Sequence, residues 1–101
     1  MTQEQIYNLL QRMQLPVAYN HFKETKSLPY LVYFTEDTSN FGADNKVYYK
    51  IDNWVIELYT DKKDINLETK LEALLEDAEL YYEKYEAYID TEKLYQVRYE
   101  I

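Results

Sequence analysis

The sequence predicts an α+β fold in which two helices lie on an antiparallel or mixed sheet of four to five strands. Three observations predict it: apolar residues at helical spacing in two separate segments, a run of β-forming residues over 30–34, and an alternating pattern near the C-terminal end. The expected order is α-β-β-β-α-β-β, closing with a β-hairpin. A chain of 101 residues can bury one ordinary core, so a single domain over residues 1–101 is expected.

The first helix is expected over residues 3–13. Thr2 followed by Gln5 has the pattern of a capping box, in which each side chain bonds the backbone N–H of the other residue. The apolar residues spaced along one helical face are Ile6, Leu9, Leu10 and Met13. Pro16 blocks continuation of the helix, so residues 17–22 should form an extended or irregular link. The first three residues of that link supply the first strand if they pair with the sheet.

Two strongly β-forming stretches follow. Residues 30–34 are apolar on both faces, which predicts a central strand covered on two sides. The second stretch runs over residues 47–59. Its inward-facing residues are expected to be Val47, Tyr49 and Ile51 at first, and Trp54, Ile56 and Leu58 later. This change of phase predicts a β-bulge near Asp52 and Asn53, because one extra residue exchanges the two faces.

The clearest helix lies in the C-terminal half, where Asn66 or Asp64 can cap it. Its apolar residues, at helical spacing, are Leu67, Leu71, Leu74, Leu75 and Ala78. From Tyr81 the period changes to two, and a turn at residues 90–92 divides a terminal hairpin. The residues expected to share the core face are Tyr81, Tyr85, Ala87 and Ile89 in its first strand and Tyr95, Val97, Tyr99 and Ile101 in its second.

The acidic composition argues against several kinds of partner. Nineteen acidic and eleven basic side chains give a net charge of -8, which repels nucleic-acid phosphates and anionic membrane surfaces. The first 13 residues lack the apolar core of a signal peptide, and no apolar run reaches the length of about 18 residues that a transmembrane helix needs. We therefore expect a cytosolic protein that neither enters membranes nor adheres to nucleic acid.

No arrangement of residues predicts catalysis or metal binding. The chain has no cysteine, two serines and one histidine, His21, and no known sequence motif pairs one of these serines with His21 as a nucleophile and its base. The acidic residues Asp61, Asp64 and Glu68 lack the alternating spacing and central glycine of a calcium loop. A single glycine excludes the phosphate-binding loops of dinucleotide enzymes and nucleotide hydrolases. No enzymatic activity, no cofactor and no metal are expected.

A long loop over residues 36–46 is the first candidate for binding a partner. It exceeds what a hairpin needs, and it carries an aromatic residue, Phe41, at a polar tip. Either a partner covers Phe41 or the ring folds back onto its own domain. The candidate interface residues in and beside this loop are Phe41, Gly42, Asp44, Asn45 and Tyr48.

Two further features are candidates for contact surfaces. One acidic stripe at helical spacing, expected on the outer face of the second helix, comprises Glu68, Glu72, Glu76 and Glu79. This stripe is either a solvated face or a surface that meets a basic partner or lines a passage. Among the thirteen tyrosines, Tyr48, Tyr82 and Tyr88 are expected opposite the core face. There they form an oligomer interface or lie beneath a covering helix.

Six segments, in their order along the chain, carry a resemblance to a known family. They are LPVAYNHF, PYLVYF, SNFGADNKVYYKID, WVIELYTDKKD, LETKLEALLED and YEKYEAYIDTEKLYQVRYEI. Over most of its length the chain resembles the small tail-assembly proteins encoded in the structural modules of long-tailed phages and prophages of Gram-positive bacteria. Within that group it is most similar to the tail-completion or tail-terminator type.

The resemblance implies a non-enzymatic virion assembly protein with an α+β fold. Such a protein forms a ring, often a hexamer, which caps the tail tube and joins it to the head connector. The implied partners are the tail tube protein, the head–tail connector protein and other copies of the chain, with DNA passing through the ring. The implied location is the host cytoplasm during assembly and then the head-proximal end of the tail. Alternatives are a head–tail connector or stopper component, or a small acidic phage-encoded regulator that binds a host protein.

Overall fold

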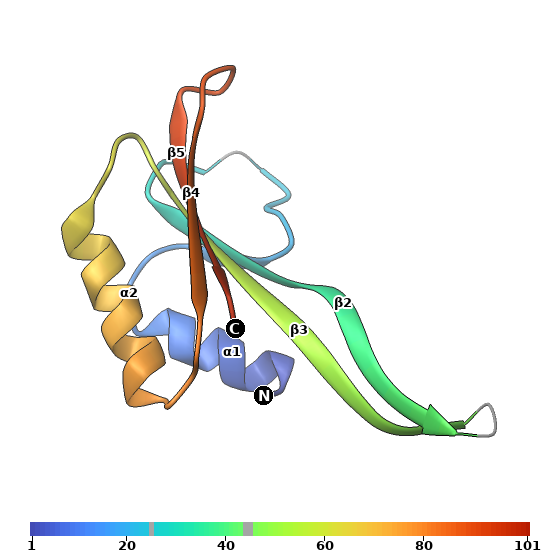
Figure 1. Ribbon diagram of the computed structural model, residues 1–101. Coiled ribbons are helices and arrows are strands. Elements are labelled where there is room, and N and C mark those ends of the chain that lie inside the picture. The colour runs from blue at the N-terminus through green and yellow to red at the C-terminus, as the bar shows by residue number, and fades with distance from the viewer. Residues whose placement is uncertain (25, 44–45) are drawn as a thin grey trace.

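Two helices and five strands follow one another in the order α-β-β-β-α-β-β (Figure 1). This computed structural model describes the backbone of residues 1–24, 26–43 and 46–101, and the side chains of residues 1–24, 26–36 and 53–101. The elements are α1 (Gln3–Gln11), β1 (Val17–Tyr19), β2 (Tyr30–Ala43), β3 (Lys46–Thr60), α2 (Ile65–Asp77), β4 (Glu83–Ile89) and β5 (Leu94–Glu100). The predicted α+β class and element order are confirmed.

The strands form one mixed sheet of order β1-β2-β3-β5-β4. β1 runs parallel to β2, with Val17 opposite Leu31, and every other neighbouring pair is antiparallel. The link after Pro16 therefore supplies a strand, and the C-terminal hairpin of β4 and β5 is confirmed. β1 and β4 are the two edges of the sheet, and each has one side without a neighbouring strand among the described residues.

Both helices pack on one face of the sheet, where they form the hydrophobic core. The sheet residues in this core alternate along the three central strands and are Leu31, Tyr33, Trp54, Ile56, Leu58, Val97 and Tyr99. The predicted stripe of α1, with Met13 just beyond its end, is buried against them. The capping box of α1 is confirmed: the backbone N–H of Thr2 donates to Gln5 Oε1 at 2.8 Å, and that of Gln5 donates to Thr2 Oγ1 at 3.1 Å.

The second helix is capped by Asp64, whose Oδ1 accepts the backbone N–H of Leu67 at 3.1 Å. Of its predicted apolar stripe, Leu71 and Leu75 are fully buried, and Leu67 and Leu74 pack partly buried against the core. The last member, Ala78, is exposed because it is the C-cap residue, at the point where the helix ends.

The opposite face of the sheet is not covered by either helix. Val32 and Val55 are nevertheless buried on this helix-free face. Residues 20–24 and 26–29 run across part of it, and the ring of Phe22 meets that of Tyr30 edge-on at 5.3 Å. The prediction that residues 30–34 form a central strand covered on two sides is therefore confirmed for Leu31, Val32 and Tyr33, which are buried, and in part for Tyr30 and Phe34, which are half-buried.

The predicted core face of β4 is wrong. Lys84, Glu86 and Tyr88 lie opposite Tyr99, Val97 and Tyr95 of β5, so these three residues, and not Tyr85 or Ala87, share the face that the helices cover. As an edge strand, β4 is exposed along nearly its whole length, and its pattern therefore does not report burial. The core face predicted for β5 is right, since Val97 and Tyr99 are buried.

The bulge predicted near Asp52 and Asn53 is present at that level of the sheet but in the other strand. The register passes from Thr35 opposite Trp54 to Asp37 opposite Asn53, so the extra residue is Glu36 of β2. A bulge in β2 leaves the alternation of β3 unchanged at this level, so the predicted change of phase within β3 near Asp52 and Asn53 is wrong. The side chains of Val47, Tyr49 and Ile51, expected to face inward, lie outside the described ones. A second irregularity makes Tyr48 the extra residue of β3.

Candidate interaction surfaces

The most prominent surface feature is a two-stranded arm formed by residues 36–43 of β2 and 46–53 of β3. The loop expected over residues 36–46 is wrong, because the two strands stay paired as far as Ala43 opposite Lys46. Within the described backbone no third strand reaches the arm, since β1 pairs no further than Tyr33 and β5 no further than Val55. Figure 1 shows the arm leading away from the helices and the rest of the sheet.

The predicted interface residues of this region belong to the arm. Phe41 lies opposite Tyr49 in the register, Gly42 lies opposite Val47, and Tyr48 is the extra residue of the second bulge. Their side chains lie outside the described ones, and the predicted contacts of Asp44 and Asn45 lie outside the described residues altogether. The register thus establishes where Phe41, Gly42 and Tyr48 sit along the arm.

An arm of two strands has a physical reason to bind another chain. Two-stranded hairpins are at best marginally stable in water on their own, and both outer edges of the arm carry backbone groups that no neighbouring described strand pairs. Contact with another protein would cover those edges. The arrangement therefore suits binding between proteins.

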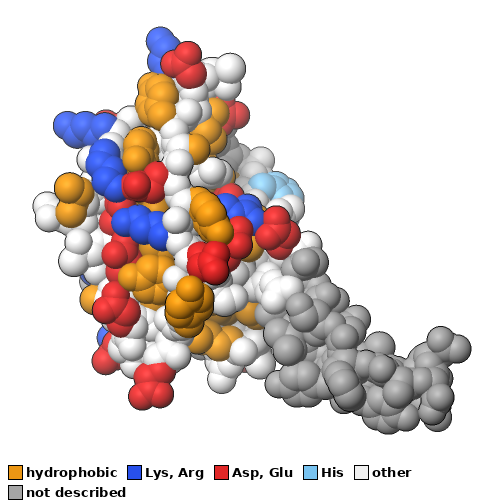
Figure 2. All heavy atoms as spheres, viewed as in Figure 1, with side chains coloured by type: hydrophobic (Ala, Val, Ile, Leu, Met, Phe, Trp, Pro, Cys, Tyr) orange, Lys and Arg blue, Asp and Glu red, His pale blue; other side chains and the backbone are white. Residues whose placement is uncertain are grey.

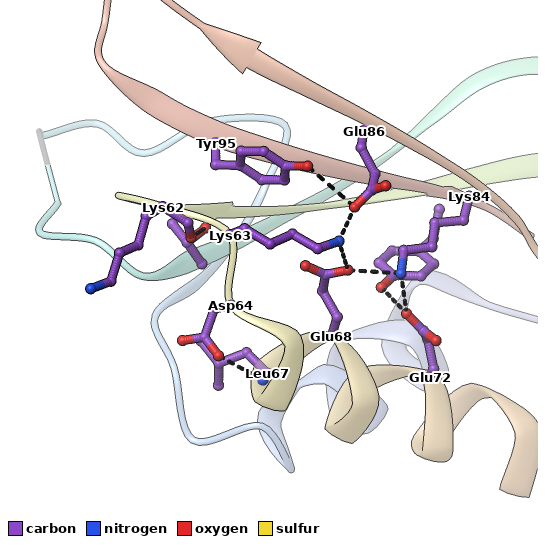
Figure 3. Close-up of polar contacts among 11 residues, drawn as sticks. Lys62, Lys63, Asp64, Leu67, Glu68, Glu72, Lys84, Glu86 and Tyr95 are labelled. Carbon is purple, nitrogen blue, oxygen red and sulfur yellow. Dashed lines mark hydrogen bonds and ion pairs between the residues drawn. The ribbon is translucent and has the colours of Figure 1, made fainter.

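The acidic stripe of α2 does not form an outer face. Glu68 is only 3% exposed, and its Oε1 accepts Lys63 Nζ and Lys84 Nζ, each at 2.7 Å (Figure 3). Glu72 binds Lys84 at 2.8 Å and accepts the hydroxyl of Tyr99 at 2.6 Å. Lys63 also pairs with Glu86 of β4. We call Lys63, Glu68, Glu72, Lys84 and Glu86 the ion cluster.

The ion cluster turns the first half of the stripe toward β4 and β5. The expected outer position is therefore wrong for Glu68, which is buried, whereas the side chain of Glu72 is 22% exposed. Glu76 accepts the hydroxyl of Tyr82 at 3.0 Å, and Glu79 lies beyond the helix end at φ 58°. In the space-filling view, basic side chains lie among acidic ones over α2, β4 and β5, in place of a continuous acidic surface (Figure 2).

The electrostatics of the ion cluster favour a structural role. Burial alone would raise the pKa of Glu72, but the hydrogen bonds from Lys84 and Tyr99 outweigh it and lower that pKa. Burial opposes charging of Lys84, yet its bonds to Glu68 and Glu72 raise its pKa. Both pKa values move away from neutrality, whereas a general acid or base works best with a pKa near the working pH. One buried oxygen, Glu68 Oε2, has no hydrogen-bond partner among the described residues.

A second polar network occupies the middle of the helix-free face, around Arg98. Its guanidinium binds Glu36 at 2.7 Å, Glu100 at 2.9 Å and Glu57 at 3.4 Å. Glu57 is 8% exposed and also accepts the hydroxyl of Tyr59 at 2.8 Å. Burial, followed by this bond to Glu57, raises the pKa of Tyr59. The network ties β2, β3 and β5 together at the base of the arm.

The predicted surface tyrosines divide into two kinds. Tyr82 packs edge-on against Tyr99 at 5.5 Å, and burial together with its bond to Glu76 raises its pKa to about 12. Tyr88 is 53% exposed, on the helix-covered side of β4. Sequence reasoning missed Tyr81 and Tyr85, which are 80% and 49% exposed, because it assigned them to the core. The only sequence feature that indicates their exposure is the presence of Glu83 and Glu86 nearby, because charged residues are typical of an exposed strand.

The described residues contain no arrangement that could hold a metal. No group of three or more histidine, cysteine or acidic side chains among them is placed as metal ligands. His21 follows β1, with its Nδ1 3.4 Å from the side-chain amide of Asn20. Within the part of the chain that the structure describes, no helix is both long enough and apolar enough to span a bilayer.

No protein-family model matches the chain. No curated protein matches its sequence either.

Proposed function

We propose that this chain is a non-enzymatic virion assembly protein of a long-tailed phage or prophage. Its most specific form is a tail terminator or tail-completion protein, which forms a ring at the end of the tail tube and joins the tube to the head connector. The partners are the tail tube protein, the connector protein and other copies of the chain. The protein acts first in the host cytoplasm and then at the head-proximal end of the tail.

The arm is the observation that supports this proposal most. It extends β2 and β3 beyond the last residues that pair with any other described strand, so the arm does not cover an edge of the remaining sheet. A ring made of head-to-tail contacts requires two different patches on each subunit. An arm at one end of the sheet and a separate surface elsewhere meet that requirement. The resemblance in sequence is what supports a phage tail as the assembly in which the chain takes part.

Binding to tail tubes tests the proposal directly. Purified protein is mixed with tail tubes that lack it, and the mixture is examined by negative-stain electron microscopy and by co-sedimentation. The expected result is a ring-shaped density at one end of each tube and a fixed number of copies per tube. A protein that stays a monomer and never sediments with tubes, at concentrations well above those of the tubes, would contradict the proposal.

A further inference from the structure

A groove lies on the helix-free face, between the segment that follows β1 and the turn that joins β4 to β5. Its volume is about 660 Å³, within the range of roughly 300 to 1,000 Å³ that is typical of binding pockets. Aromatic rings form its floor: Tyr30 stacks on Tyr59 at 5.1 Å, and Phe22 meets Tyr30 edge-on. Apart from Tyr59, whose hydroxyl binds Glu57 of the Arg98 network, the residues that line this groove belong neither to that network nor to the ion cluster.

The groove carries cations that the rest of the protein does not use. Lys23 and Lys26 are exposed on its rim, and neither makes an ion pair with a described residue; Lys26 Nζ lies 5.9 Å over the ring of Phe22. Glu24 and Glu92 also line it, so the groove is electrically neutral when His21 is neutral. In a chain of net charge -8, a neutral groove with two unpaired lysines is a favourable place for an acidic group.

An acidic aromatic surface of matching chemistry lies at the other end of the same face. We call Tyr81, Glu83 and Tyr85 the tyrosine patch. Glu83 lies opposite Glu100 in the register, and the hollow beside it is also lined by Glu36. Arg98 binds Glu36 and Glu100, whereas Glu83 makes no ion pair with a described residue. Tyr85 donates its hydroxyl to Glu83 at 2.7 Å, which holds a ring and a carboxylate together on an exposed surface.

We propose that the groove binds the tyrosine patch of a second copy of this chain. The rings of Tyr81 and Tyr85 would pack on the aromatic floor, and Glu83 would meet Lys23 and Lys26 at the rim. Tyrosine is among the residues that contribute most to protein interfaces, and complementary charges at a rim fix orientation. The inference rests on the proposed function, because it specifies which surfaces join two copies.

A single copy cannot make this contact with itself. The groove lies at the end of the sheet where Ile89 pairs with Leu94, whereas the patch lies at the end where Glu83 pairs with Glu100. The two surfaces are therefore separated by the length of β4. After the first contact one copy keeps a free patch and the other keeps a free groove, which allows further copies to join.

The test uses two variants, each of which breaks one surface. Lys23→Glu with Lys26→Glu removes the cations of the groove, and Glu83→Lys with Tyr85→Ser removes the patch. Sedimentation velocity over a range of protein concentrations should show that each variant self-associates at least about tenfold more weakly than the wild type. Mixing the two variants should restore a heterodimer, because each retains the intact surface that the other lacks.

The controls separate this contact from other routes of assembly. The control variant Lys62→Glu with Lys70→Glu changes the net charge by the same amount as Lys23→Glu with Lys26→Glu, but at exposed positions outside the groove. It should self-associate like the wild type. Unchanged far-ultraviolet circular dichroism establishes that each variant is folded. If the wild type self-associates and both test variants do so equally well, the groove contact is overturned while the proposed function stands. A wild type that shows no self-association up to about millimolar concentration would also overturn the groove contact.

Discussion

Replacing Lys84 with alanine tests the claim that the ion cluster holds α2 against β4. Lys84 Nζ binds Glu68 at 2.7 Å and Glu72 at 2.8 Å, so its removal takes a cation from two carboxylates at once. Glu68 is 3% exposed and cannot regain full hydration. Lys63 still binds the same Oε1 of Glu68, which limits the loss.

The expected loss follows from these contacts. A hydrogen bond to a charged group contributes roughly 1.5 to 3 kcal/mol, and breaking a fully buried ion pair costs roughly 3 to 5 kcal/mol. Lys84 is 30% exposed, so water replaces part of what is lost and the lower range applies. We expect the free energy of unfolding to fall by about 1 to 3 kcal/mol. With a urea m-value of about 1 to 3 kcal/mol/M, the unfolding midpoint should fall by on the order of 1 M.

Urea unfolding followed by tryptophan fluorescence measures this loss, because Trp54 is buried in the core. Lys84→Met keeps the apolar stem that lies near the ring of Tyr99, so it separates loss of charge from loss of packing. Lys62→Ala is the matched control, since Lys62 is exposed and its side chain has no polar partner among the described residues. A Lys84→Ala midpoint equal to that of Lys62→Ala would refute the structural role of the cluster.

Three further predictions concern other parts of the protein. The pKa of Glu72 is lowered, so its stabilising contribution is present above the usual carboxyl value of 4.5 and is lost as the pH falls through the lowered pKa. The urea midpoints at pH 7 and pH 3 should therefore differ less for Glu72→Gln than for the wild type. Leu71→Ala should lower the free energy of unfolding by roughly 2 to 5 kcal/mol, whereas Ile65→Ala, at a position that is 65% exposed, should change it by less than about 0.5 kcal/mol; equal effects would contradict the orientation of α2. Phe41→Ser should leave the urea midpoint unchanged but weaken binding to tail tubes, and a variant that binds tubes like the wild type would remove Phe41 from the interface.

The sequence predicts the elements whose signals are local. The capping box of Thr2 and Gln5 and the stripe from Ile6 to Met13 lie within a few residues of one another, and the structure bears both out. The inward set of Trp54, Ile56 and Leu58 is also right, because this strand is covered by helices on one face. Alternation is informative wherever one face of a strand is buried.

The features that the sequence misses depend on partners distant along the chain. The bulge falls at Glu36 because the register of β2 against β3 decides it, and no pattern within β3 can show that. Lys84 points toward α2 because two carboxylates compensate its charge there, although a lysine would ordinarily be assigned to the solvent side. The groove likewise requires Phe22, Tyr59 and Glu92, which come from three separate segments.

Deletion of the arm tests the central claim, that the arm serves assembly and not the stability of the folded body. Replacing residues 38–52 with Asn-Gly joins Asp37 to its register partner Asn53 through a two-residue hairpin turn. Co-sedimentation with tail tubes is then compared between this variant and the wild type, after circular dichroism and urea unfolding of both. The account predicts a folded variant of nearly unchanged stability that no longer sediments with tubes. A folded variant that caps tubes as the wild type does would contradict it.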